Sequence, residues 1–364
     1  MRTFWQTVLL CVIASCSGED DPLRGAPELG TGDSSPSSVA FTVIASAADG
    51  LAQPRDLAFN PLRPDELWII NHDDDSMVIV FGTPGDGRTS EKRVDGYALH
   101  FMEQVTAIAF GQDQTTFGLP GTFGTCGESR NTYNGQAPPN DFTGPTLWSS
   151  DLSIFAKMNP NGLGSHLDML HNTPLCMGIA HEADNRYWTF NGLAGSIDRY
   201  DFADDDGIGN DNHSDGLTWR FAEGQLGYVA GVPSHLVWDG RTSILYIADP
   251  GNQRVARLDG LSGTEGQLRN GFETPIRDMQ GAVLEDVVPP GTLGRPSGLE
   301  LKDDVLFVAD NDTSRITAYD LDGQELNHLD TGLPPGSLGG LTFGSDEKLY
   351  FTDLVGHSVL RIDP

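Results

Sequence analysis

The chain has 364 residues and a formal net charge of −30, because 52 Asp and Glu residues outnumber 22 Lys and Arg residues. This excess of negative charge argues against nucleic acid and anionic lipid surfaces as partners, since both repel such a protein. The length alone would allow two domains, but 44 Gly and 22 Pro residues fit many tight turns, and no long helical period is visible. We therefore expect one all-β domain.

The start of the chain indicates export. Residues 1–15 have a basic start and an apolar run too short to span a bilayer, as in a signal peptide. The run ends in Ile-Ala-Ser-Cys, which resembles a bacterial lipobox and makes Cys16 the expected lipidated residue; the alternative is an ordinary signal peptide cleaved nearby. Residues 16–38 are rich in Gly, Ser and Pro and should act as a flexible tether. Ser17 fits sorting to an outer membrane or cell surface, so we expect contact with the membrane only through the lipid anchor.

A short pattern recurs along the rest of the chain: an apolar strand, a polar turn that begins with Asp or Asn, and a second strand. Residues 245–255 carry the clearest copy, Leu-Tyr-Ile-Ala-Asp-Pro-Gly-Asn-Gln-Arg-Val. Further copies lie at 306–316, 349–359 and 67–77, and degraded ones at 187–191 and 147–151. Another apolar strand precedes each copy, and a weaker fourth strand follows, as at 217–221 and 325–329. One such unit cannot bury its own hydrophobic face, so neighbouring units must stack.

Four strands per unit at roughly 40–45 residues is the period of a β-propeller. The aromatic anchors of the repeated strands number six: Trp68, Trp148, Trp188, Tyr246, Phe307 and Tyr350. The sixth unit lacks a fourth strand, whereas the β-branched run at 39–45 belongs to no unit. We therefore predict that 39–45 completes the last blade and closes a six-bladed β-propeller, which covers 39–364 and leaves no open sheet edge.

The turn D-x-x-N-x-R-V at 249–255 resembles the NHL repeat. The resemblance covers the chain from about residue 39 to residue 364 and is weakest in the second unit. Related six-bladed propellers include peptidyl-hydroxyglycine lyases, SMP-30/gluconolactonase-like hydrolases and many pure binding modules. The resemblance therefore implies the fold and leaves the function open.

The residues that begin the polar turns should lie on one face, around the mouth of the central channel. We call them the turn openers: Asn71, Asp151, Asn191, Asp249, Asp310 and Asp353. They form a candidate binding ring, but Asp and Asn side chains also accept turn N–H groups, and we favour that structural role.

Histidines bear on the enzyme hypothesis, because the resemblance to the lyases implies metal-binding histidines at matching inner-strand positions. Those positions hold no histidine here: Arg55, Thr106, Met177, Ser234, Ser297 and Gly339. Arg55 and Ser234 remain weak candidates for substrate contacts, since an arginine at the channel would hold a carboxylate. His72, His235 and His357 are weak metal candidates if they converge on one face. The gluconolactonase-like enzymes begin their first inner strand with a glutamate ligand, for which Asp56 is a poor match, and no nucleophile elbow is present.

Residues 201–216 form the densest acidic cluster and combine oxygen ligands with turn-forming glycines, as calcium loops do. The weak metal candidates in it are Asp204, Asp206, Asp211 and Asp215. The spacing does not satisfy an EF-hand, and a solvated acidic loop is the alternative. The sequence requires no cofactor. Calcium is the ion that this loop would bind.

Two cysteines remain after the signal and the lipidation site. Cys126 and Cys176 should form a disulfide in an exported domain; two free or buried thiols are the alternative.

Long insertions decorate the repeat. We expect 111–145 to interrupt the second blade between its first two strands, and 260–294 to interrupt the path from the fourth blade to the fifth. We also expect 201–216 and 260–294 to overhang the face that carries the turn openers, and 111–145 the other face. The first face is then the expected binding surface, unless the loops merely cover blade edges.

These observations favour an exported, lipid-anchored propeller that acts as a cell-envelope binding or scaffold module for a protein, peptide or glycan. The alternative is a metal-dependent lyase or lactone hydrolase with a cation at the channel mouth.

Overall fold

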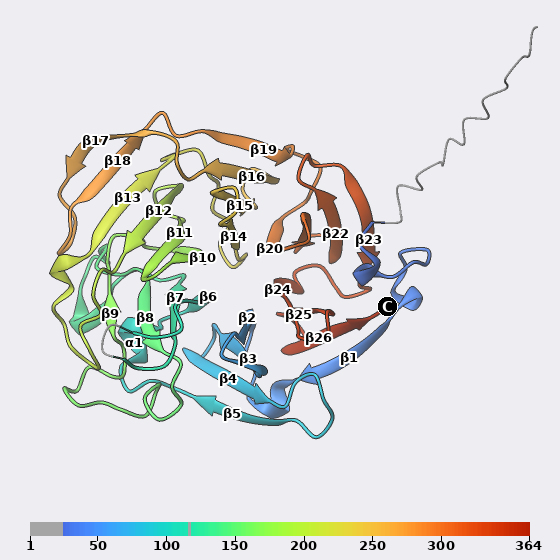
Figure 1. Ribbon diagram of the computed structural model, residues 1–364, viewed down its shortest axis with the longest axis horizontal. Coiled ribbons are helices and arrows are strands. Elements are labelled where there is room, and N and C mark those ends of the chain that lie inside the picture. Colours follow the sequence, from blue (N-terminus) through green and yellow to red (C-terminus); the bar gives the residue numbers. More distant parts are fainter. Residues whose placement is uncertain (1–24, 116–117) are drawn as a thin grey trace, which may run out of the picture.

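The structure, a computed structural model, describes residues 25–115 and 118–364; the expected export signal and Cys16 lie outside these residues. Six sheets stand in a ring around a central axis, and helices are few and short (Figure 1). The prediction of an all-β, six-bladed propeller is therefore confirmed. Within the described ranges, no helix has the length and apolar character needed to cross a membrane.

Each blade is built on four strands, which lie side by side in order from the axis to the rim. Blade 1 holds β2 (Pro54–Asn60), β3 (Arg63–Asn71), β4 (Ser76–Phe81) and β5 (Thr89–Arg93); blade 2 holds β6 (Val105–Phe110), β7 (Thr122–Gly127), β8 (Thr146–Ser149) and β9 (Asp168–Met169). Blade 3 holds β10 (Cys176–Ala183), β11 (Arg186–Asn191), β12 (Ser196–Asp201) and β13 (Leu217–Phe221); blade 4 holds β14 (Leu236–Asp239), β15 (Ile244–Asp249), β16 (Arg254–Asp259) and β19 (Leu284–Val288). Blade 5 holds β20 (Pro296–Lys302), β21 (Val305–Asp310), β22 (Arg315–Asp320) and β23 (Glu325–Asp330); blade 6 holds β24 (Leu338–Phe343), β25 (Leu349–Asp353), β26 (Ser358–Asp363) and β1 (Ala40–Ala45).

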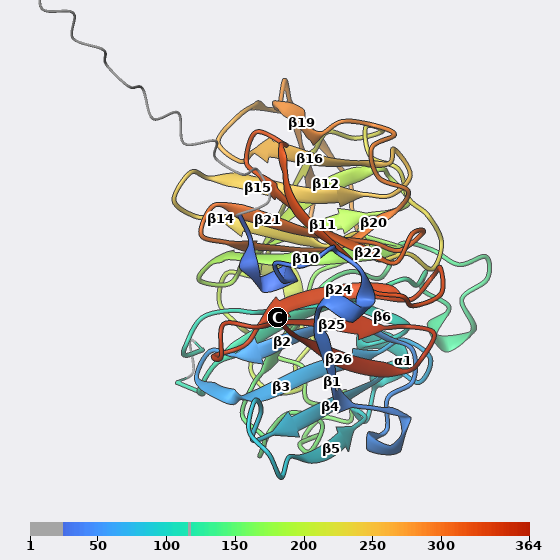
Figure 2. The same cartoon turned by 90° about the vertical axis from the view of Figure 1, so that its right-hand side faces the viewer.

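The ring closes between the two ends of the propeller domain. Strand β1 pairs antiparallel with β26, and Ala40 lies opposite Asp363 (Figure 2). This pairing supplies the missing fourth strand of blade 6, as the sequence predicts, and covers the outer edge of β26.

The hydrophobic core is divided among the interfaces between blades. The described residues form six buried apolar clusters, and each joins two neighbouring blades. The second strands are therefore apolar on both faces; in β3, for example, the last six residues are all buried. A single blade would leave both of these faces in water, so the blades are stable only in the ring.

The disulfide joins two of these blades. Cys126 in β7 and Cys176 in β10 are bonded, with their Cα atoms 5.6 Å apart. This confirms the predicted pairing and links blades 2 and 3 across their interface.

One strand assignment in blade 2 is wrong. Trp148 lies in β8, the third strand, whereas the second strand is β7, which pairs with both β6 and β8 inside the expected 111–145 insertion. Strand β7 is hard to recognise because its sequence, TFGTCG, has two glycines and one large apolar residue. Packing favours glycine at position 124, since a Cβ there would lie 2.8 Å from the Ile179 side chain and 3.0 Å from the Tyr187 ring.

This shift removes Asp151 from the ring of turn openers. Ser149 pairs with Thr122 at the beginning of β7, so Asp151 lies at the edge where second strands begin, not where they end. The other five turn openers close the second strands of their blades. The face on which they lie is called the turn-opener face below.

The insertions also differ from expectation. Residues 111–121 link the first two strands of blade 2, and 128–145 link the second and third strands on the turn-opener face. The 201–216 loop begins at Asp201, which pairs with Arg186 at the start of β11. This loop therefore leaves from the face opposite the turn-opener face. The reason is strand direction: a third strand ends at the edge where the second strand begins.

The 260–294 insertion does not overhang a face. It contains the hairpin β17 (Thr264–Arg269) and β18 (Ile276–Gln280), and β18 pairs parallel with β13. Blade 3 thereby becomes a six-stranded sheet, and the chain then returns to blade 4 through β19.

Candidate functional site

The five turn openers on one face are occupied by local contacts. Asn71, Asn191, Asp249, Asp310 and Asp353 are all buried. An oxygen of Asp249, for example, accepts the amide of Gly227 at 2.8 Å, and the oxygens of Asp310 accept the amides of Gly294 and Arg295 at 2.8 Å each. Such contacts stabilise the turn and the loop that enters the same blade.

Arg55 lies at the channel on the turn-opener side and is 3 % exposed. Its Nη2 donates to Gln53 Oε1 at 2.7 Å, and its Nη1 donates to the carbonyl of Gly231 and lies 3.7 Å from Glu128 Oε2. Burial lowers the pKa of Arg55, although the charge of Glu128 opposes this effect. The guanidinium is thus engaged by protein groups.

The three candidate histidines have separate partners. His72 Nε2 lies 3.6 Å from Glu128 Oε2, and His357 Nδ1 accepts the amide of Gln53 at 2.8 Å. His235 lies deeper in the channel, where its Nδ1 is 3.5 Å from Asp56 Oδ1. Ser234, next to it, is buried, and its hydroxyl has no hydrogen-bond partner.

Close backbone contact narrows the centre of the channel. A Cβ at Gly298 would overlap the carbonyl oxygen of Gly339, and one at Gly340 would overlap Asp56 Oδ1. Only glycine fits such an approach. The blades therefore meet near the axis.

A polar cavity of about 190 Å³ remains on the side away from the turn openers. It is lined by Asp56, His235 and Glu300, among others. Burial raises the pKa of Asp56 to about 8 and that of Glu300 to about 7, and it lowers the pKa of His235 to about 4. Near pH 7 Asp56 and His235 are therefore largely uncharged, whereas Glu300 is close to the midpoint of its titration.

A larger cavity, of about 410 Å³, lies at the outer edge of blades 1 and 2. The single-turn helix α1 (Ala98–Phe101) forms one wall, with Phe101 buried and Leu99 73 % exposed. The ring of Tyr97 lies 5.3 Å from that of Tyr133, which comes from the 128–145 loop. Partly exposed aromatic faces therefore border the cavity on the turn-opener face.

A second cavity, of about 190 Å³, shares Tyr97, His100 and Tyr133 with the first. We call the two together the rim groove. Phe142 stacks on His171 with ring centres 3.7 Å apart, and His171 Nδ1 lies 2.7 Å from Glu273 Oε2. The second cavity is thus walled by aromatic rings, imidazoles and a carboxylate.

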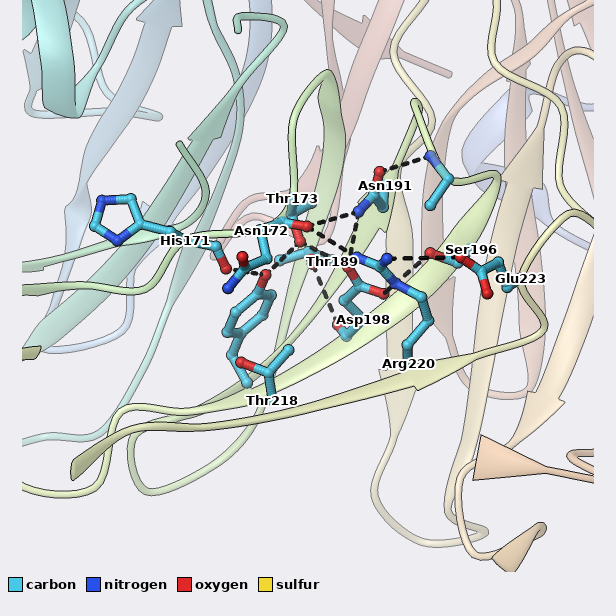
Figure 3. Close-up of polar contacts among 12 residues, drawn as sticks. His171, Asn172, Thr173, Thr189, Asn191, Ser196, Asp198, Thr218, Arg220 and Glu223 are labelled. Carbon is cyan, nitrogen blue, oxygen red and sulfur yellow. Dashed lines mark hydrogen bonds and ion pairs between the residues drawn. The ribbon is translucent and has the colours of Figure 1, made fainter. Parts of the chain in front are cut away.

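A buried polar network holds the segment that carries His171 (Figure 3). Arg220 forms two hydrogen bonds with Asp198, at 2.7 and 2.6 Å, and a third with the carbonyl of Asn172 at 2.8 Å. The side-chain Nδ2 of Asn191 donates to the same carbonyl of Asn172 and to Asp198 Oδ2. The His171 ring points away from the network in Figure 3, so the network anchors its backbone and leaves the ring to the groove.

The acidic loop packs onto the outer edge of blade 2. His213 is buried, and its Nδ1 lies 2.8 Å from Asp168 Oδ1 and 3.1 Å from Asp206 Oδ2. The other three acidic metal candidates, Asp204, Asp211 and Asp215, have exposed side chains. Asp211 lines the second cavity of the rim groove.

Burial dominates the electrostatics at this edge. It raises the pKa of Asp168 to about 7 and that of Asp206 to about 6, and it lowers the pKa of His100 to about 4 and of His166 to about 3. Burial also acts to lower the pKa of His213, but the hydrogen bond and charge of Asp168 outweigh it and raise that pKa.

Sequence reasoning identified part of this region. It predicted the 111–145 insertion, in which Tyr133 and Phe142 lie, and named Asp206 as a metal candidate. It missed residues from three other segments: Tyr97, His100, Asp168, His171 and Glu273. The available signal was that seven of nine histidines lie outside the predicted inner strands. Four of these, His100, His166, His171 and His213, are brought together at this edge.

No protein-family model matches the chain, and no curated protein matches it by sequence. Solved structures do resemble it. An auxiliary nutrient binding protein from Bacteroides thetaiotaomicron has a TM-score of 0.55 and 11 % identity, covering 86 % of this chain and 69 % of the other. A luciferin-regenerating enzyme has a TM-score of 0.54 and 13 % identity, covering 90 % and 95 %. An auxiliary nutrient binding protein from Bacteroides ovatus has a TM-score of 0.52 and 13 % identity, covering 90 % and 76 %.

At these identities the likeness shows the shared propeller fold. The neighbours include both binding proteins and an enzyme, so the fold alone does not select between these classes. The choice depends on the site geometry.

Proposed function

We propose that the protein is an exported binding module that holds a neutral, hydroxyl-rich ligand, such as a glycan, in the rim groove. The observation that carries this proposal is the cavity of about 410 Å³ bordered by Tyr97 and Tyr133 and continued by a second cavity. Aromatic faces beside a few polar groups are typical of small-ligand sites. Export and lipid anchoring through Cys16 belong to the proposal and would place the groove at the cell envelope.

Charge favours a neutral ligand over an anionic one. Among the described residues that line the larger cavity there is no Lys or Arg, whereas three carboxylates are present. Asp95 accepts the amide of Tyr97 at 2.9 Å, and Asp75 accepts the amide of Gln104 at 2.7 Å. These carboxylates hold the walls in place, and with a net charge of −30 they disfavour phosphates and acidic peptides.

The comparisons support the same class of function. Two of the similar structures are named as auxiliary nutrient binding proteins. A protein, a peptide or a glycan was expected from the sequence, and the size of the groove favours a short glycan.

The test is a glycan array with the purified full-length chain in detergent, followed by calorimetry with the glycans that bind. We expect Tyr97→Ala and Tyr133→Ala each to weaken binding about 10-fold or more, because an aromatic contact contributes on the order of 1 kcal/mol beyond the area it buries. Leu261→Ala, at a side chain that is 81 % exposed outside the groove, is the control and should bind like the wild type. Absence of any glycan binding, or binding that neither tyrosine variant weakens, would contradict the proposal.

A channel enzyme is the second candidate. The cavity lined by Asp56, His235 and Glu300 favours it, because it combines two carboxyl groups and an imidazole at the axis. The reaction class would be the metal-dependent lyase or lactone hydrolase expected from the sequence, and one of the similar structures, the luciferin-regenerating enzyme, is an enzyme. Turnover of a lactone panel that is lost in both His235→Ala and Glu300→Gln would establish this function; turnover that survives both changes would remove the channel as its site.

A further inference from the structure

A cluster of charged groups lies at the outer edge of blade 2, far from the channel. Asp168 belongs to β9, while Asp206 and His213 belong to the loop between β12 and β13 of blade 3. One ligand-type atom from each residue lies within 4.8 Å of the other two. Asp168 is 0 % exposed and His213 is 5 % exposed, so water can hydrate these charges only poorly.

Hydrogen bonds alone do not satisfy this cluster. The Nδ1 atom of His213 faces Asp168 Oδ1 at 2.8 Å, Asp206 Oδ2 at 3.1 Å and the amide of Met169 at 3.3 Å. One imidazole nitrogen carries at most one proton, so it cannot donate to both carboxylates while accepting from the amide. The second oxygen of Asp168, Oδ2, is buried and has no hydrogen-bond partner. Leaving a buried carboxylate oxygen unpaired is costly.

A metal ion removes this conflict. Two ligand atoms bound to a metal at about 2.1 Å stand about 3 Å apart at the right angles of an octahedron and about 3.4 Å apart at tetrahedral angles. The distances from His213 Nδ1 to Asp168 and Asp206 are of that size. Two carboxylates also balance the charge of a divalent cation, and the nitrogen lone pair becomes a ligand.

We propose that Asp168, Asp206 and His213 bind one divalent transition-metal ion. An imidazole with two carboxylates suits zinc or manganese, whereas calcium and magnesium favour oxygen ligands alone. This differs from the calcium site expected from the sequence, because Asp206 faces a buried imidazole and Asp204, Asp211 and Asp215 are exposed. Of the three ligands only His213 lines the rim groove, and the proposal does not depend on glycan binding, since three protein side chains and not a bound glycan would hold the ion.

Two further imidazoles and a cavity open to solvent lie beside the cluster. The His166 and His171 rings lie 5.9 and 6.1 Å from the His213 ring, and the cavity that His213 lines is open to solvent. Water from this cavity can complete the coordination that three protein ligands leave open.

The test is metal binding by the full-length chain after chelator treatment and dialysis into metal-free buffer. Calorimetry with Zn²⁺ and Mn²⁺, backed by elemental analysis after gel filtration, should show one ion per chain for at least one of them, and a tenfold excess of Ca²⁺ should not displace it. His213→Ala and Asp206→Asn should each weaken binding at least about 100-fold, because loss of a ligand exceeds the effect of losing a supporting contact. The bound ion should raise the Tm of the wild type and not that of the variants.

His328→Ala is the matched control, because His328 also lies 2.7 Å from a carboxylate, that of Glu325, but on blade 5. It should bind the metal like the wild type. If His213→Ala does not fold, Asp206→Asn, at a partly exposed position, decides the question. No stoichiometric ion in the wild type, or equal affinity in a folded ligand variant, would overturn the proposal. Tyr97→Ala should leave metal binding intact, so failure of the glycan proposal remains distinguishable from failure of this one.

Discussion

His213 Nδ1 lies 2.8 Å from Asp168 Oδ1, although the two residues are 45 positions apart and belong to different blades. The contact exists because the acidic loop folds back onto blade 2. The amide of Asp206 donates to the carbonyl of Leu167 at 3.0 Å, and the amide of Gly209 donates to that of His166 at 2.8 Å. Residues 201–216 are thus an inter-blade contact in addition to being an acidic loop.

The Arg220–Asp198 pair should be important for stability. Both side chains are buried, at 8 % and 0 % exposure, and Arg220→Ala would leave the Asp198 carboxylate without its cation. We expect a loss of about 3–5 kcal/mol in the free energy of unfolding, measured by urea denaturation. Arg186→Ala, on the same blade but paired with the exposed Asp184, should cost less than about 1 kcal/mol. Similar losses in both variants would contradict this assignment.

The disulfide should stabilise the interface between blades 2 and 3. Cys126 and Cys176 are 50 positions apart, and closing a loop of that length stabilises a protein by about 4 kcal/mol in the chain-entropy estimate. The double variant Cys126→Ser/Cys176→Ser should lose about 2–5 kcal/mol in urea denaturation under oxidising conditions. A reducing agent should destabilise the wild type by a comparable amount and leave the variant unchanged. A wild type insensitive to reduction would count against this role.

Glu300 should make stability depend on pH. Burial raises its pKa from 4.5 to about 7, so the folded state holds this proton more tightly than the unfolded state does. Ionisation therefore opposes folding: this term is absent below about pH 4.5, grows as the pH rises and levels off above about 7. Glu300→Gln mimics the protonated acid and keeps the oxygen that accepts the Leu301 amide.

We expect this variant to match the wild type near pH 5 and to exceed it by about 1–3 kcal/mol near pH 8. Urea denaturation at the two pH values measures the difference. Glu347→Gln, at a side chain that is 76 % exposed, is the control for replacing a carboxyl by an amide. A difference for Glu300→Gln that is the same at both pH values would refute the buried-acid explanation.

The glycines at the axis should resist substitution. Gly298→Ala places a Cβ on the carbonyl oxygen of Gly339, and backbone cannot move aside as a flexible side chain can. Overpacking of this kind costs about 1–3 kcal/mol or more, and thermal denaturation should show it. Gly240→Ala meets only the Trp238 side chain at 3.5 Å, an ordinary contact, and should be tolerated. Equal Tm values for the two variants would show that the blades can separate at the axis.

Local patterns were sufficient for most of the fold. Strands such as β15 and β21 are apolar on both faces and end in Asp, so their character and their turns are visible over a few residues. The run at 39–45 belonged to no blade, and blade 6 lacked one strand, so the pairing between them could be predicted. Strand β7 was missed because glycine at position 124 reflects close packing against Ile179, and glycine has a low strand propensity.

The sequence by itself determined the number of blades, the closure of the ring and the pair of cysteines that meet, because these follow from repeated local strands and simple counting. Only the tertiary structure decided where the candidate sites lie. Tyr97 meets Tyr133, and His213 meets Asp168, across loops whose paths depend on the direction in which each strand leaves its blade. Such contacts have no period in the sequence, since they join segments that ring closure and inter-blade packing bring together.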